Sequence, residues 1–236
     1  MKTFYKIILS LLVVVLYSGC SMYQLVSLSG DLPVNDKLQF YSENSDVKVV
    51  YSFNGQGGPI NIEIFNKKDN PIYVDWSKSA FVIKDQSFTL WNDDAVIKGS
   101  ALEFKVNPNN TVRSISSFEG TISKQDKVTF IPPQTKITRY SYQVCSSVID
   151  DKEKPFQRMT LISDAEEFNE YSVKKYMYTI GDTPLMFSIF LTISDNENSN
   201  NPIQLSSKYW ASELINANVN VTKSKVIGGN QFFNLR

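Results

Sequence analysis

The chain has 236 residues, with 24 Lys and Arg, 24 Asp and Glu, and no histidine. This length suffices for one large domain or two small ones, and 42% hydrophobic with 13% aromatic residues exclude a disordered chain. A formal net charge of zero lacks the excess of Lys and Arg that a general nucleic-acid binder needs, so we expect no nucleic-acid partner. The missing histidine excludes Ser-His-Asp and Cys-His catalysis and His-rich zinc sites.

The first residues have the pattern of a targeting segment. Lys2 and Lys6 precede an apolar run over residues 7–17 that only Ser10 interrupts. This run fits the apolar part of a signal peptide, roughly 7–15 residues, and is shorter than the roughly 17–25 of a transmembrane helix. The sequence Leu16-Tyr17-Ser18-Gly19-Cys20 that ends it resembles the lipobox of bacterial lipoproteins, with tyrosine at the usual leucine position. We therefore predict a lipoprotein signal peptide over residues 1–19.

The lipobox resemblance implies a modified cysteine and a membrane anchor. Signal peptidase would cleave between Gly19 and Cys20, and the Cys20 sulfur would carry a diacylglyceryl thioether. Each buried CH₂ contributes about 0.8 kcal/mol, so more than one acyl chain holds a protein on a membrane without a basic patch. The alternative is an ordinary secretory peptide that happens to precede a cysteine. Cys145 then remains without a disulfide partner, and we predict a small buried hydrophobic side chain there.

The mature chain begins with a polar stretch. Residues 20–37 contain Gly30 and Pro33, and we predict a lipidated N-terminus and tether here, with Tyr23–Leu28 as an optional early strand. The folded domain is expected over residues 38–236, as one unit or split into two.

Apolar and polar residues alternate along three stretches that follow. The stretches are 47–53, 60–64 and 72–76, and glycines with Pro59 separate the first two. Alternation with period two indicates half-buried strands. Further strand candidates are 80–84, 88–91, 102–106, 112–116, 128–131, 136–144, 157–162, 171–180, 185–194 and 205–215. A capping-box pattern at Ser163–Glu166 predicts at most one short helix, so we expect an all-β, antiparallel sandwich.

One segment resembles a known group of proteins. The stretch from Asn61 to Ser79, NIEIFNKKDNPIYVDWSKS, is similar to the hallmark stretch of uncharacterised lipoproteins of Bacteroidota, and residues 183–192 are a second match. The resemblance implies an immunoglobulin-like β-sandwich behind a lipobox. It carries over no activity and no functional residue.

The remaining candidates for a site are few. Exposed aromatic rings bind sugars, and Trp91 precedes the polar turn Asn92-Asp93-Asp94, while Trp210 lies among Ser and Lys; Trp76 is predicted to be core. Two S-x-x-K motifs, Ser45–Lys48 and Ser172–Lys175, fall in predicted strands, where their side chains face opposite ways. We therefore predict no catalytic residue, no cofactor and no metal site.

These observations favour a non-enzymatic, lipid-anchored binding or assembly module of the cell envelope. Its expected partners are the membrane, through the lipid on Cys20, and an envelope protein or a glycan. The alternatives are a surface glycan-binding lipoprotein and a carboxylate-dependent envelope hydrolase. No acidic residue follows Cys20 until Asp31, which favours the periplasmic leaflet of the outer membrane over the cell surface.

Overall fold

The computed structural model describes residues 23–235 except 92–94, 107–112, 125, 151–153, 163–169, 198–201 and 219–226. The described chain is almost entirely antiparallel β-structure, which confirms the predicted all-β class. Its one described helix is a 3₁₀ turn at Trp76–Lys78. The strands are β1 (Tyr23–Gly30), β2 (Phe40–Glu43), β3 (Val47–Ser52), β4 (Pro59–Asn66), β5 (Ile72–Asp75), β6 (Ala80–Ile83), β7 (Gln86–Thr89), β8 (Ala95–Val106), β9 (Arg113–Lys124), β10 (Val128–Ile131), β11 (Lys136–Gln143), β12 (Gln157–Ile162), β13 (Glu170–Met177), β14 (Met186–Ser194), β15 (Ile203–Ala217) and β16 (Gln231–Leu235).

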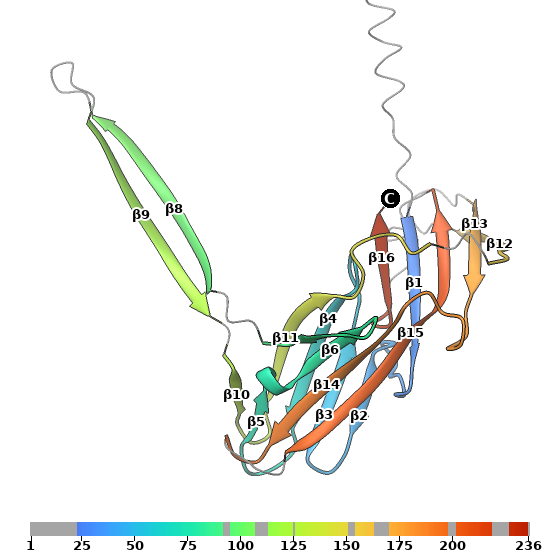
Figure 1. Ribbon diagram of the computed structural model, residues 1–236, viewed down its shortest axis with the longest axis horizontal. Helices are drawn as coiled ribbons and strands as arrows, with labels where there is room; N and C mark the ends of the chain where they lie inside the picture. Colours follow the sequence, from blue (N-terminus) through green and yellow to red (C-terminus); the bar gives the residue numbers. More distant parts are fainter. Residues whose placement is uncertain are drawn as a thin grey trace, which may run out of the picture.

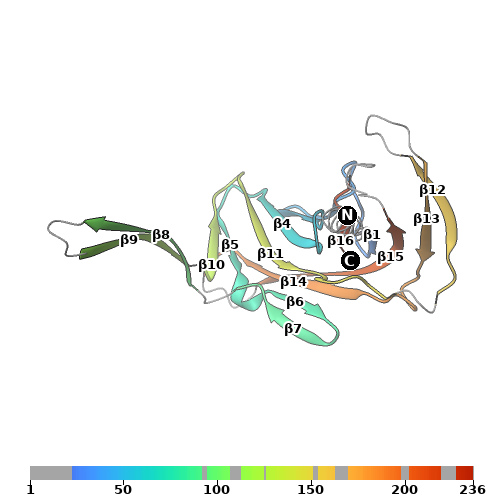
Figure 2. The same cartoon turned by 90° about the horizontal axis from the view of Figure 1, so that it is seen from above.

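Two sheets pack face to face (Figure 1). The larger sheet has the order β10-β5-β14-β15-β1-β16, with the β6–β7 hairpin added to β14 and the β12–β13 hairpin added to β15. The smaller sheet has the order β11-β4-β3-β2. Figure 2 shows that the larger sheet curls at its β13 and β12 end. The predicted signal peptide and Cys20, together with Ser163–Glu166, lie outside the described residues.

Period-two alternation places one face of each central strand in the core. Ile60, Ile62 and Ile64 on β4 are fully buried, and they belong to one core cluster with Val74 of β5 and Trp76 of the 3₁₀ turn. Burying one such side chain contributes about 1.5–3 kcal/mol, so these strands hold the sandwich together. Trp76 is fully buried and its indole N–H donates to the Thr129 hydroxyl, which confirms the prediction that this tryptophan belongs to the core.

The optional early strand predicted at Tyr23–Leu28 is present as β1, Tyr23–Gly30, and it belongs to the sandwich and not to a tether. Strand β1 lies between β15 and β16 in the larger sheet, and its Val26 and Leu28 are buried in the core. The folded domain therefore includes strand β1, which was predicted to precede it. The stretch looks polar in sequence, yet Gln24 is only 1% exposed and makes its hydrogen bonds inside the protein, to the backbone of Ile149 and the Asn216 side chain.

Backbone hydrogen bonds and aromatic contacts connect the two sheets at their sides. On the β16 side, backbone hydrogen bonds join Phe233 to Gly55 and Gly57 in the turn before β4. Gly58 in the same turn has φ +67°, and a Cβ there would lie 3.0 Å from the Phe232 ring, so this position requires glycine. Side chains of the β6–β7 hairpin and of β11 also meet, through the rings of Phe81, Phe88 and Tyr142.

The hairpin of β8 and β9 pairs within itself along its whole length, from Ala95 opposite Lys124 to Val106 opposite Arg113. Both views show it projecting away from the sandwich (Figures 1 and 2). It contributes no strand to either sheet of the sandwich.

Candidate functional site

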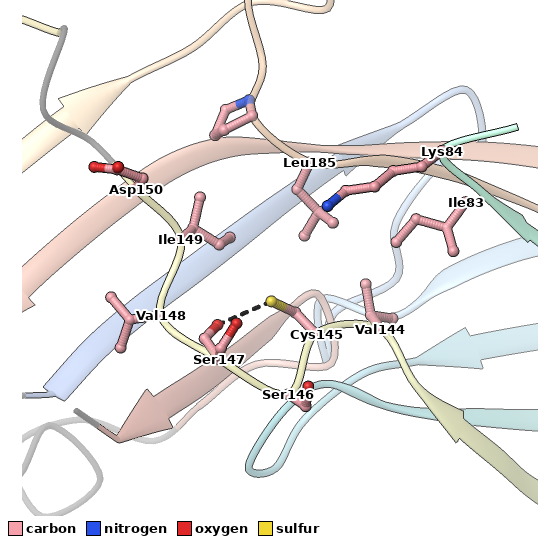
Figure 3. A pocket seen from close by; sticks show the side chains of 11 residues that line it. Ile83, Lys84, Val144, Cys145, Ser146, Ser147, Val148, Ile149, Asp150 and Leu185 are labelled. Carbon is pink, nitrogen blue, oxygen red and sulfur yellow. Dashed lines mark hydrogen bonds between the residues drawn. The ribbon is translucent and has the colours of Figure 1, made fainter.

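A pocket of about 410 Å³ lies where the β6–β7 hairpin meets the segment that follows β11 (Figure 3). Three parts of the chain form it: the end of β6, the segment 144–150, and the residues just before β14. The lining residues are Ile83, Lys84, Val144, Cys145, Ser146, Ser147, Val148, Ile149, Asp150, Pro184 and Leu185.

Hydrogen bonds from both sheets hold the segment 144–150 in place although it is not a strand. The backbone N–H groups of Val144 and Cys145 donate to the carbonyls of Gly58 and Gly57, each at 3.0 Å. The loop backbone is therefore attached to the turn before β4.

Two buried side-chain amides fix the rest of this segment. Gln24 of β1 both donates to the Ile149 carbonyl at 2.9 Å and accepts from the Ile149 N–H at 2.7 Å. Asn234 of β16, 2% exposed, donates to the Ser147 carbonyl at 2.9 Å. These amides take the place of a neighbouring strand, so the wall of the pocket is preformed.

The pocket has an apolar base and a polar rim. Val144, Ile149 and Leu185 are 4%, 8% and 5% exposed. Figure 3 shows Lys84 and Leu185 on one side of the space and Cys145 and Ser147 on the other. Lys84 is placed by the turn of the β6–β7 hairpin, where it and Asp85 have φ values of 49° and 61°, as a two-residue type I′ turn requires.

Cys145 was predicted to be buried, and the structure places it half-buried in the pocket wall. It packs against the main core, and its thiol donates to the Ser147 carbonyl at 2.9 Å. The chain has no histidine to act as a base toward this thiol. The geometry gives Cys145 a packing and hydrogen-bonding role in the wall.

An aromatic group lies on β6, β7 and β11, the strands from which the pocket segments continue. Phe81, Phe88 and Tyr142 have ring centroids 6.0–6.2 Å apart; Phe81 is buried, whereas Phe88 is 38% and Tyr142 37% exposed. The Tyr142 hydroxyl donates to the Thr89 carbonyl at 2.9 Å, which fixes the ring. Phe81 and Tyr142 each lie two residues along the chain from a pocket residue, Ile83 and Val144, and none of the three rings lines the pocket itself. Sequence analysis missed this group because its members are distant in the chain.

Arg139 of β11 forms a cation–π pair with the buried Trp76. The Arg139 guanidinium lies 4.3 Å from the centroid of the Trp76 ring and donates to the Leu90 carbonyl at 2.9 Å. Burial lowers the pKa of Arg139, against the opposing charge of Asp126. This pair fixes the chain where β7 ends, just before Trp91.

The two tryptophans predicted as ligand contacts are not brought together. Trp91 is half-buried against the main core after β7, and residues 92–94 that follow it lie outside the described residues. Trp210 is half-buried on β15, opposite Met186 of β14. Its neighbour Tyr209 faces the core, so Trp210 lies on the other face of the sheet. Neither tryptophan lines the pocket.

The S-x-x-K motifs have structural partners. Lys48 forms an ion pair with Glu43, and Lys175 forms one with Glu213. Ser45 donates to the adjacent Asp46. Among the described residues, no three His, Cys, Asp or Glu side chains gather as metal ligands would, and no helix is long and apolar enough to cross a bilayer.

Comparisons of the chain with family models, curated proteins and solved structures each find no match.

Proposed function

We propose that this protein is a lipid-anchored, non-catalytic binding or assembly module of the cell envelope, and that the pocket of Figure 3 is its binding surface. The lipobox-like sequence around Cys20 supports the anchor. The outer membrane, on its periplasmic leaflet, is the proposed location.

The pocket is the observation that carries the binding role. An apolar base with a few polar groups at the rim is typical of sites for small ligands or inserted side chains, and this volume lies in their usual range of about 300–1,000 Å³. Lys84, Ser146 and Asp150 offer hydrogen bonds to a polar ligand or to the backbone of a partner protein. Asp150 is the one carboxylate among the described lining residues, whereas paired-carboxylate hydrolysis needs two.

The anchor is tested by changing its cysteine. Cys20→Ala should abolish incorporation of labelled fatty acid and remove the protein from the membrane fraction. Cys145→Ala is the matched control and should keep both the label and the location. A Cys20→Ala protein that still carries label would exclude the proposed lipidation.

The pocket is tested by site-specific crosslinking in cells. A photoreactive benzoylphenylalanine at Ser146, on the pocket rim, should capture a ligand or partner. The same group at Ser45, in an exposed turn before β3, should not. Equal adducts from both positions would mean that the pocket is not the binding surface.

The exposed rings of Phe88 and Tyr142 favour glycan binding as a second candidate function. Sugar rings stack their apolar faces on such side chains, and the serine hydroxyls of the adjoining segment supply hydrogen-bond partners. Titration with cellobiose and chitobiose, followed by calorimetry, tests this candidate. Tyr142→Ala should abolish binding and Trp210→Ala should leave it unchanged; no heat from either sugar would leave the protein-binding function as the better proposal.

Leaflet orientation separates the two functions further. Proteinase K added to intact cells should leave the protein uncut until the outer membrane is opened, if it faces the periplasm. Prompt digestion on whole cells would favour the surface glycan-binding alternative.

A further inference from the structure

The end of the larger sheet that carries Tyr23 lies close in sequence to the proposed lipid. Only Ser21 and Met22 separate Cys20 from Tyr23, the first residue of β1. Tyr23 lies opposite Ala217 of β15 on one side and opposite Leu235 of β16 on the other. We call this edge of the domain the Tyr23 end; it also includes Tyr171 at the start of β13 and Leu161 near the end of β12, which are paired with each other.

The chain between the proposed lipid on Cys20 and the Tyr23 end is short. An extended chain spans at most about 3.3–3.6 Å per residue, so the Cα of Tyr23 lies within about 11 Å of that of Cys20. The polar region on each side of a bilayer is roughly 5–8 Å thick, the difference between a core of about 30 Å and a total of about 40–45 Å. A lipid on Cys20 therefore leaves the Tyr23 end at the headgroup layer.

The side chains at this end suit that layer. Leu25, Val173, Ile215 and Ala217 form a small buried apolar cluster, separate from the main core. Half-buried Tyr23, Tyr171, Leu161 and Phe233 pack against it, and the rings of Tyr23 and Phe233 lie 6.4 Å apart. Leu235 is 43% exposed.

Tyrosine is enriched where membrane meets water, because its ring is apolar and its hydroxyl is polar. We propose that the Tyr23 end is a membrane-contact surface, which lies in the headgroup region of a phospholipid bilayer with Tyr23, Tyr171 and Leu235 as lipid contacts. This inference depends on the proposed lipid anchor on Cys20. It adds that the domain is seated directly on the bilayer and is not held away from it by a tether.

The experiment uses the full lipidated chain in vesicles of phosphatidylethanolamine and phosphatidylglycerol. A Cys145→Ser background leaves the introduced cysteine as the one free thiol, since Cys20 is a thioether. Leu235→Cys places an environment-sensitive fluorophore at the Tyr23 end. Phe130→Cys is the control, because Phe130 is 51% exposed on β10, far from β1 in both views (Figures 1 and 2).

Lipids with a nitroxide at the headgroup or the upper acyl chain should quench the fluorophore at position 235 and blue-shift its emission, while position 130 remains unquenched. Flotation of the vesicles reports the anchor independently. Protein that floats while both positions remain unquenched would overturn the membrane-contact surface and leave the anchor intact. Protein that does not float would overturn the anchor, and the contact surface with it. Equal quenching at both positions would show that the domain lies on the bilayer without using this end, and would also overturn the assignment.

Discussion

Asn66 at the end of β4 should be one of the most sensitive polar positions in the domain. Its side chain is fully buried, and its Nδ2 donates to three backbone carbonyls, those of Asn70 at 2.9 Å and of Ile131 and Pro132 at 3.1 Å. Its Oδ1 accepts from the Lys68 N–H at 2.9 Å. This one amide links the turn after β4 to the chain after β10, alongside the Asn66 backbone N–H, which donates to the Thr135 carbonyl, and the Gln134 side chain, which donates to the Lys67 carbonyl. Asn66→Ala removes the buried part of this link.

The cost follows from the hydrogen bonds. Each contributes about 0.5–1.5 kcal/mol net, and a buried carbonyl left without a donor costs about 1–3 kcal/mol. Ile131 itself is fully buried, so water cannot replace the lost donor at its carbonyl without opening the core. We expect Asn66→Ala to lower the free energy of unfolding by about 3–5 kcal/mol.

Asn61 on the same strand is the matched control. Its Nδ2 makes one long hydrogen bond, 3.2 Å, to the Ser52 hydroxyl, and its Oδ1 is buried without a partner in the described structure. Removing an unpaired acceptor offsets the lost bond, so Asn61→Ala should cost at most about 1 kcal/mol.

Urea unfolding followed by tryptophan fluorescence, to which buried Trp76 contributes together with Trp91 and Trp210, measures both variants. The midpoint should fall strongly for Asn66→Ala and little for Asn61→Ala, with the slope m unchanged in both. Equal losses for the two variants, or a loss below about 1 kcal/mol for Asn66→Ala, would show that the buried amide network does not stabilise the fold.

Three further predictions concern stability. Ile62→Ala removes a fully buried side chain from the core and should cost about 2–5 kcal/mol in the same urea assay; a loss under 1 kcal/mol would contradict the packing. Burial raises the pKa of Tyr209 well above its ordinary value, so the stability it provides is present below about pH 10 and is lost as pH rises further. Its hydroxyl makes no hydrogen bond of ordinary geometry in the described structure, and its polar neighbour is the Ser207 hydroxyl. Tyr209→Phe should therefore leave stability at pH 7 unchanged or higher and flatten the alkaline decline; a clear loss at pH 7 would show that the two hydroxyls are paired. The pKa of Asp182 is lowered to about 2 by the Lys154 ammonium and then by the backbone and hydroxyl of Thr179. Its contribution is complete above the ordinary value of 3.8 and is lost as pH falls toward 2, so Asp182→Asn should make the acid-induced fall of the urea midpoint shallower than in the parent protein, and an unchanged slope would refute this assignment.

The central strands were predictable because a strand buried on one face has alternating apolar and polar residues in its sequence. Ile60, Ile62 and Ile64 alternate with Asn61 and Glu63, and such a pattern fits little else than a half-buried strand. Strands β3, β4 and β5 were located in this way to within a residue or two.

Strands without clear alternation were predicted only in part. The strand at Tyr23–Leu28 was offered only as an option within a tether, because Gln24 and the serines resemble loop composition. Their hydrogen-bond partners lie far along the chain, where local sequence gives no sign of them. The β8–β9 hairpin was predicted only as 102–106 and 112–116, because Gly99 opposite Gly120 shows no alternation, although the pairing continues past it.

The pocket could not be predicted from the sequence at all. Its three segments are separate in the chain, and the amides that hold them, Gln24 and Asn234, lie near opposite ends of it. Local patterns report which face of a strand is buried, and they do not report which loops the fold brings together. The partly exposed rings of Phe88 and Tyr142 were missed for the same reason.

Because β1 lies between β15 and β16, the centre of the larger sheet joins the first described strand of the chain to its last two. A ribosome makes β1 first and β16 last, yet Gln24 bonds to Asn216, 192 residues away, and Ser27 accepts from Gln231, 204 residues away. During synthesis the first strand has no neighbours for its N–H and C=O groups, and two open edges of this kind are prone to pair with other chains. The larger sheet can therefore form completely only after β15 and β16 have been synthesised. Contacts between residues so far apart in the sequence make folding slow. The N-terminal strand of a nascent chain therefore stays without its sheet partners until β15 and β16 have been made.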